Sequence, residues 1–93
     1  MMDAQQFQAE LIRDGFEPAI AGEYTPGLVK PDHTHPFEVR GLVLSGEMVI
    51  TGRNNAQHCG PGDVFVMRFG DVHREEVGAG GVRYLYGSRQ PVA

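Results

Sequence analysis

Glycine and proline interrupt this chain at short intervals, and their spacing limits the folds that the chain can adopt. The 93 residues include 13 glycines and six prolines, and after Gly15 these residues separate short apolar segments. Both residues favour turns, because glycine tolerates a positive φ and proline fixes φ and lacks an N–H group. Short strands at such close spacing, with no helix between them, are typical of an antiparallel sandwich or barrel. We therefore predict an all-β domain.

The apolar runs between these turns predict the individual strands. Residues 39–44 form the strongest predicted strand, because their apolar side chains are nearly continuous. We expect a hairpin turn at Ser45-Gly46, from which residues 47–51 return alongside the first strand. Residues 78–81 are predicted to form a loop tip, followed by a last strand at residues 82–86.

Residues 3–14 are predicted to form the one helix of the chain. Asp3 can accept a hydrogen bond as its N-cap, Gln6 stands at the capping-box position, and Gly15 fits a left-handed C-terminal stop. The predicted apolar face comprises Ala4, Phe7 and Leu11, with Ile12 beside them. This face is expected to pack on the barrel, with packing on a partner chain as the alternative.

The length of the chain predicts a single domain, near the lower size at which a chain buries a useful core. We assign residues 1–16 to a helix packed on the barrel, residues 17–89 to the barrel itself and residues 90–93 to a tail. A small open barrel that carries an apolar N-terminal helix is expected to form a homodimer.

The composition argues against several classes of protein. The formal net charge of −4 offers no basic patch for nucleic acid. No apolar run approaches the roughly 20 residues that span a bilayer, and the N-terminus lacks the basic and apolar regions of a secretory signal. The single cysteine, Cys59, excludes an intrachain disulfide and fits a reducing cytoplasm. We therefore expect a cytoplasmic protein with no nucleic-acid or membrane partner.

Three of the four histidines form a pattern that suits a metal ion. His33 and His35 are two residues apart, so on an extended strand their side chains point to the same face. His73 can complete the group if its strand lies alongside. Imidazole is the commonest protein ligand for divalent transition metals, and three imidazoles leave positions open for water or substrate.

The residues around these histidines resemble the two sequence motifs of the cupin family. In the first stretch, Gly27 precedes His33 and His35, and Glu38 and Gly46 follow them. The resemblance extends over nearly the whole chain, roughly residues 24–87. It implies an antiparallel β-barrel of the cupin type, which is like a jelly roll.

The second stretch runs from Gly62 through Gly70 to His73 with the spacing of the second cupin motif. It departs from the family pattern at two positions. Arg68 stands where the family usually has proline, and Val77 stands where the motif often ends in asparagine.

The resemblance implies one divalent transition metal, which would be iron, manganese, nickel or zinc. The ligands that it implies are His33, His35 and His73, with Glu38 as a further candidate.

Glu38 follows the histidines one residue earlier than the glutamate of the family motif, whose position here is Val39. In an unbroken strand Glu38 points away from the histidines, whereas a bulge at Pro36 would turn it inward. Three roles stay open for Glu38: a fourth ligand, an acceptor for the N–H group of a ligand imidazole, or an exposed carboxylate.

The resemblance allows two classes of function. The first is a small metal-dependent enzyme of the dioxygenase, isomerase or decarboxylase type that acts on a small organic molecule. The second is a non-catalytic cupin module that binds or senses a small ligand. In both classes the partner of the domain is a small molecule, and a purely structural barrel is the third alternative.

The candidate catalytic residues are Glu38 and Glu75. On a regular strand Glu75 shares the face of His73, where it can accept a proton or a hydrogen bond, and a solvated side chain is the alternative. Arg40 and Arg68 are candidates to anchor an anionic ligand. Candidate residues for the wall of a pocket, or for the core, are Phe37, Met48, Phe65, Phe69, Tyr84 and Tyr86.

Overall fold

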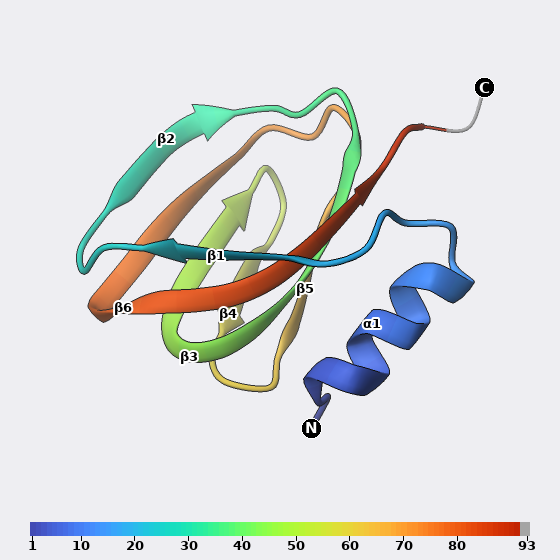
Figure 1. The fold of residues 1–93 in the computed structure, drawn as a ribbon. Helices are drawn as coiled ribbons and strands as arrows, with labels where there is room; N and C mark the ends of the chain where they lie inside the picture. The colour runs from blue at the N-terminus through green and yellow to red at the C-terminus, as the bar shows by residue number, and fades with distance from the viewer. Residues whose placement is uncertain (92–93) are drawn as a thin grey trace.

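A computed structural model of the protein describes residues 1–91 and shows one helix and six strands there (Figure 1). In chain order these elements are α1 (Ala4–Arg13), β1 (Ile20–Tyr24), β2 (Val29–His33), β3 (Glu38–Gly52), β4 (Ala56–Cys59), β5 (Val64–Met67) and β6 (His73–Arg89). The prediction of an antiparallel all-β fold with one short N-terminal helix is confirmed. The predicted tail includes residues 92–93, which lie outside the described residues. Among the described residues, no helix is long and apolar enough to cross a bilayer.

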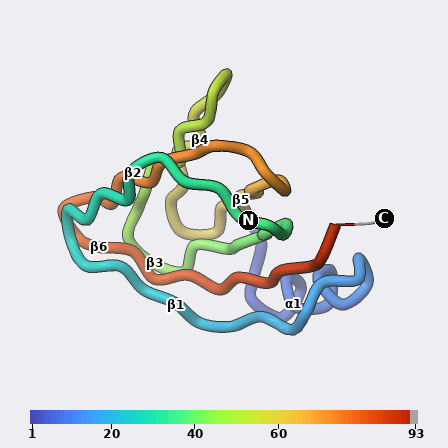
Figure 2. The backbone as a smooth tube through the Cα atoms, turned by 90° about the horizontal axis from the view of Figure 1, so that it is seen from above, coloured from blue at the N-terminus to red at the C-terminus, as the bar shows by residue number. Residues whose placement is uncertain are grey.

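The two long strands, β3 and β6, belong to two layers at once. The first half of β3 lies between β5 and the second half of β6, which pairs in turn with β1. The second half of β3 lies between β4 and the first half of β6, which pairs in turn with β2. All of these pairings are antiparallel. Figure 2 shows that the resulting strands surround an interior.

The predicted hairpin turn at Ser45-Gly46 is wrong, because β3 continues through this point and pairs with β6 on both sides of it. The predicted loop tip at residues 78–81 is likewise wrong, since these residues lie inside β6. Register shifts on either side of Gly46 mark bulges, which bend a strand without ending its ladder. Gly46 and Gly81 both have a positive φ, of 77° and 76°, where an L side chain would be strained. The two strands therefore bend together at a pair of glycines.

The interior between the layers is filled by apolar side chains from most of the strands. Val39, Val43, Met48 and Ile50 of β3 are buried there, together with side chains from β4, β5 and β6. Gly41 faces the same interior and lies against the ring of Phe65, so a larger residue would displace that ring.

The helix forms a second, smaller apolar cluster. Phe7 and Leu11 of α1 pack with Phe16 and with Leu42 of β3. Successive residues of a strand point to opposite faces, and the neighbouring Val43 is in the interior, so α1 covers the outer face of β3. The other two residues of the predicted apolar face, Ala4 and Ile12, are exposed.

The ends of α1 follow the predicted pattern. The side chain of Asp3 accepts a hydrogen bond from the backbone N–H of Gln6 at 2.8 Å, and Gly15 has a φ of 82°. The side chain of Gln6 donates to Glu10 at 3.0 Å. The first half of the predicted capping box is therefore present, while Gln6 serves as a link along the helix.

Two arginines enclose the ring of Phe16 at the end of the helix. The guanidinium carbons of Arg40 and Arg89 lie 4.5 and 4.6 Å from the ring centroid. Arg40 donates to Asp14 at 2.6 Å, and Arg89 donates to Glu38 at 2.8 Å. Arg40, a candidate for binding an anionic ligand, is thus engaged in attaching the helix to the sheet.

Replacing Gly46 by alanine should lower the free energy of unfolding by about 2–5 kcal/mol, measured by denaturant titration. The left-handed backbone costs about 1–2 kcal/mol for a residue with a Cβ, and overpacking costs about 1–3 kcal/mol. Here the Cβ would overlap the carbonyl oxygen of Gly81. Gly80→Ala is the matched control, because a Cβ there meets no atom within 4 Å. Equal effects of the two substitutions would contradict the proposed role of the bend.

Cys59 should react slowly with thiol reagents in the folded protein. Burial raises the pKa of its thiol to about 11, and the Asp63 carboxylate adds to the shift. The thiolate is the reactive form, so a pKa raised by about two units lowers the reactive fraction near pH 8 roughly a hundredfold. Release of the chromophore from an aromatic disulfide reagent measures this rate, with the same chain in guanidinium as the control. Similar rates in the two conditions would contradict the buried position.

Candidate metal centre

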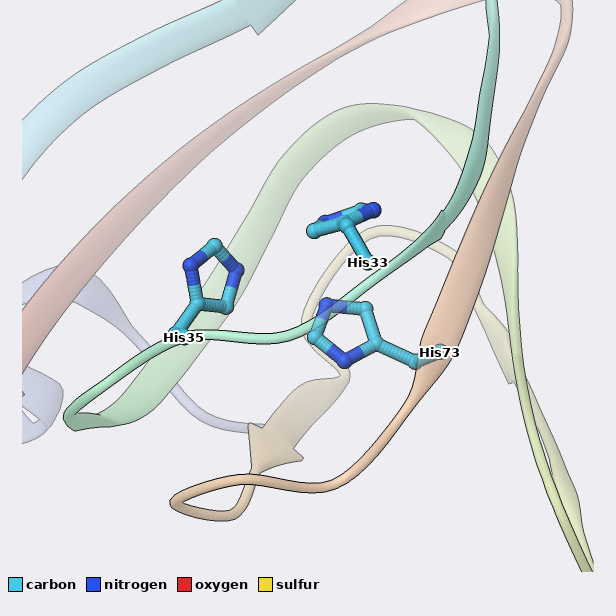
Figure 3. A group of neighbouring side chains, drawn as sticks. All are labelled: His33, His35 and His73. Carbon is cyan, nitrogen blue, oxygen red and sulfur yellow. The ribbon is translucent and has the colours of Figure 1, made fainter.

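The three histidines of the predicted metal site lie together in the structure (Figure 3). His33 ends β2 and His73 begins β6, and the two are direct partners in the ladder between these strands. His35 follows two residues after β2. Each histidine offers one ring nitrogen, and these three nitrogens lie within 4.8 Å of one another. The fold therefore brings residues from two distant parts of the sequence to one point.

Two local features orient this group. The register of β2 against β6 shifts between Lys30 and His33, a stretch that contains Pro31, which cannot donate to the ladder. The backbone carbonyl of His35 accepts a hydrogen bond from the N–H of Gly70 at 3.0 Å. This bond ties the segment after β2 to the turn that precedes His73.

Backbone carbonyl groups fix the direction of two of the imidazole rings. Nδ1 of His33 lies 2.7 Å from the carbonyl oxygen of Pro31, and Nδ1 of His73 lies 3.1 Å from that of Asp71. A carbonyl oxygen only accepts, so each Nδ1 must carry the hydrogen. Each neutral ring then presents the lone pair of Nε2, which is the atom that can bind a metal.

Both of these Nε2 atoms are buried and have no hydrogen-bond partner. Buried polar atoms without a partner are rare in proteins, because leaving them unpaired is unfavourable. A divalent metal ion would give both nitrogens a partner, so the donor atoms fit such an ion.

The surroundings of His35 favour its neutral imidazole form. Burial lowers the pKa of its imidazole, and the nearby His73, His33 and Lys30 lower it further. Metal ligation requires a neutral imidazole. The environment of His35 therefore favours the form that binds a metal.

Glu75 lies in the interior next to this group. Its side chain is 4% exposed, and its Oε2 atom is buried without a hydrogen-bond partner. Oε2 lies 3.4 Å from Nε2 of His33. Among the alternatives for Glu75, the structure favours a group that faces the site over a solvated side chain.

Glu38 lies apart from the three converging nitrogens. It begins β3 opposite Arg89 of β6, and its Oε1 accepts a hydrogen bond from Arg89 at 2.8 Å. Its carboxylate is thus engaged in the cluster around Phe16. The group of close donor atoms comprises His33, His35 and His73 without Glu38.

A cavity of about 210 Å³ adjoins the site. His35 and Glu75 lie in its wall, and the other lining residues are Tyr24, Phe37, Val39, Met48, Phe65, Met67, Tyr84 and Tyr86. Five of the six residues predicted for a pocket wall or core are among them. The sixth, Phe69, is 54% exposed.

The aromatic side chains of this cavity contact one another. The rings of Tyr24 and Tyr84 have centroids 5.2 Å apart, and His35 stacks on Phe37 at the same distance. Burial, aided by the neighbouring Tyr24, raises the pKa of the Tyr84 hydroxyl, which therefore stays protonated at neutral pH. Tyr24 was not among the predicted wall residues, because its strand shows no clear alternation in sequence.

A second hollow, of about 650 Å³, also reaches His73. Its other lining residues come mostly from the connections between β3 and β4 and between β5 and β6, and they include Arg53 and Arg68. Both arginines are exposed. The three-histidine group thus lies between an aromatic interior and a polar outer hollow.

Comparison with known proteins identifies the family. Residues 16–88 match the model of the AraC-like ligand binding domain family. A search of curated proteins found no significant match.

Several solved structures share the fold. The cupin domain of Cnp3 from Schizosaccharomyces pombe has a TM-score of 0.70 at 20% identity, covering 80% of this chain and 52% of that one. A protein of unknown function from Rhizobium leguminosarum bv. viciae 3841 has a TM-score of 0.75 at 18% identity, covering 98% of each chain. DMSP lyase DddQ from Ruegeria pomeroyi DSS-3 has a TM-score of 0.71 at 25% identity, covering 81% of this chain and 39% of that one.

The chain thus spans about half of the Cnp3 chain and a smaller part of the DddQ chain. The matched family model covers most of the chain, from just after the helix to near the end of β6. Together with the shared fold of the solved structures, this match shows that the chain belongs to the AraC-like ligand binding domain family and is a cupin.

Proposed function

We propose that this cupin domain binds one divalent transition metal ion and holds a small organic molecule in the adjoining cavity. The ligands would be His33, His35 and His73. The observation that carries this proposal is the convergence of one ring nitrogen from each of the three histidines. The buried Nε2 atoms of His33 and His73, which have no hydrogen-bond partner, support it. Iron, manganese, nickel and zinc are all compatible with imidazole ligands.

In this proposal, backbone groups of the protein orient the imidazole rings for metal binding. The carbonyl groups of Pro31 and Asp71 hold the rings of His33 and His73 with Nε2 toward the ion. When bound, the ion would act as a Lewis acid that can polarise an oxygen atom of the small molecule.

The cavity supports a small ligand with an apolar or aromatic body. Its volume of about 210 Å³ corresponds to roughly seven water molecules at about 30 Å³ each. Aromatic side chains such as Phe37 and Tyr86 line its wall, and His35 and Glu75 provide a polar side. The match to a ligand binding domain family supports a binding role.

A metal-dependent enzyme is the second candidate function. It is favoured by Glu75, which places an unpaired carboxylate oxygen in the wall of the same cavity. Such a group can accept a proton from a substrate that is bound in the cavity. One of the proteins with the same fold is named as a lyase, which is compatible with this role.

The expected homodimer and the cytoplasmic location stay predictions. Apolar side chains exposed on and around β5 are compatible with an interface between two copies. They include Val64, Val66, Phe69 and Val72.

Protein purified without a histidine tag or chelators should contain about one transition metal ion per chain by elemental analysis. His35→Ala should lose that metal, because it removes one of three converging donors. His58→Ala is the matched control, since His58 is exposed and outside the group. If the wild type holds no metal and cannot be loaded with any, the proposal is wrong.

Val39→Phe should abolish small-ligand binding and leave the metal content unchanged. Val39 is buried in the cavity wall, so a larger side chain takes up ligand volume, at a cost to stability of about 1–3 kcal/mol. Thermal unfolding of metal-loaded protein with small phenolic, thiol and diketone compounds measures binding. Val64→Phe, on the exposed side of β5, is the control. A compound that stabilises wild type and Val39→Phe equally would place its site outside this cavity.

A further inference from the structure

We infer that Glu75 supplies a carboxylate ligand to the same metal ion, so that three imidazole nitrogens and one carboxylate oxygen bind it. This inference rests on the proposed metal site and names a ligand beyond its three histidines. It assigns Glu75 to the metal itself, in place of a role as a proton acceptor for a substrate.

The burial of Glu75 without a partner is the first observation. Only 4% of its side chain is exposed, and Oε2 makes no hydrogen bond. Glu75 lies opposite Lys30 in the ladder, but the ammonium group of Lys30 donates to Tyr24 at 3.2 Å and lies over its ring. A buried carboxylate is unfavourable unless a cation or hydrogen bonds compensate its charge. A metal ion between Glu75 and the histidines would provide that cation.

The separation from His33 is the second observation. Oε2 of Glu75 lies 3.4 Å from Nε2 of His33, and neither atom has a hydrogen-bond partner. Two donor atoms that are each about 2.1 Å from one ion in tetrahedral geometry lie about 3.4 Å apart. The two atoms are therefore spaced as two ligands of one ion are. The close group of donor atoms holds the three histidines and not Glu75. Glu75 reaches the group at His33, so its carboxylate would have to turn toward the other two nitrogens to bind the same ion.

The direction of the His33 ring argues against an indirect role for Glu75. A carboxylate that orients a metal-bound imidazole accepts a hydrogen bond from the ring nitrogen that does not bind the metal. In His33 that nitrogen is Nδ1, and the carbonyl of Pro31 already serves it at 2.7 Å. Glu75 faces Nε2, the nitrogen that would bind the ion.

The position of Glu75 on β6 is also consistent with a role as a metal ligand. It follows His73 by two residues in the same strand, so the two side chains share the interior face. Glu38, the acidic residue that was predicted as a metal ligand, is paired with Arg89. An added oxygen ligand favours harder ions such as manganese and iron, and it reduces the net charge of the bound centre.

The test compares metal binding by wild type, Glu75→Gln and Glu38→Gln. Each metal-free protein is titrated with manganese(II) against a chelating indicator, and cobalt(II) absorption spectra report the ligand set. Glu75→Gln should raise the manganese Kd at least about tenfold and change the cobalt spectrum, because it removes a ligand. Glu38→Gln should change neither, since it alters a carboxylate of the Phe16 cluster. Glu75→Asp, which keeps a carboxylate, should bind manganese more tightly than Glu75→Gln.

Stability provides a second readout that does not depend on activity. Metal-free Glu75→Gln should unfold at a Tm close to that of metal-free wild type, because Oε2 of Glu75 makes no hydrogen bond that the substitution would break. The rise in Tm on adding manganese should be smaller in Glu75→Gln than in wild type.

The outcomes separate this inference from the proposed function. An unchanged manganese Kd and cobalt spectrum in Glu75→Gln, with metal still bound by the wild type, would overturn the inference and leave a three-histidine site. Wild type that binds neither ion would instead overturn the proposed metal site itself. If Glu75→Gln does not fold, Glu75→Asp takes its place, and a raised manganese Kd with a changed cobalt spectrum supports the carboxylate ligand. A manganese Kd and cobalt spectrum of Glu75→Asp that both equal those of the wild type would overturn the inference.

Discussion

The antiparallel ladder between β3 and β6 is the constraint on which the rest of this structure depends. These strands pair from Glu38–Arg89 at one end to Gly52–His73 at the other. The shared bend at Gly46 and Gly81 lets one ladder serve two layers without a break in its hydrogen bonds. One end of the ladder carries the helix cluster, and the other carries His73. The cavity beside the histidines takes side chains from both halves of the ladder, among them Val39, Met48 and Tyr86.

The sequence was sufficient to predict the fold class, the ends of the helix and the three histidines. These features depend on local chemistry, namely turn residues, caps and a spacing of two along a strand. The bend at Gly46 was mistaken for a hairpin because a turn and a bulge use the same residue types, and only the partner strand distinguishes them. The interior position of Glu75 could not be settled either, because alternation places it with His73 but does not show whether that face is buried.

Glu38 shows that a residue close to the histidines in sequence can have its side chain in a different environment. The residue stands close to the histidines in sequence, yet its carboxylate pairs with Arg89 across the ladder. Arg89 in turn lies over Phe16, to which Arg40 also contributes a guanidinium group. These contacts involve residues far apart in the chain, so no local pattern predicts them. The carboxylate nearest to the histidines therefore comes from β6, on the strand that carries His73.

The unpaired polar atoms of this domain are concentrated at one place. The buried side-chain atoms without partners in the described residues are Nε2 of His33, Nε2 of His73 and Oε2 of Glu75. Elsewhere the interior is mainly apolar, which stabilises the fold by removing that surface from water. A concentration of unsatisfied groups in an otherwise well-packed interior is typical of functional sites, where local stability is given up for binding. Since an ion bound by the proposed histidine ligands would give both Nε2 atoms a partner, metal binding and the stability of this end of the barrel should be thermodynamically linked.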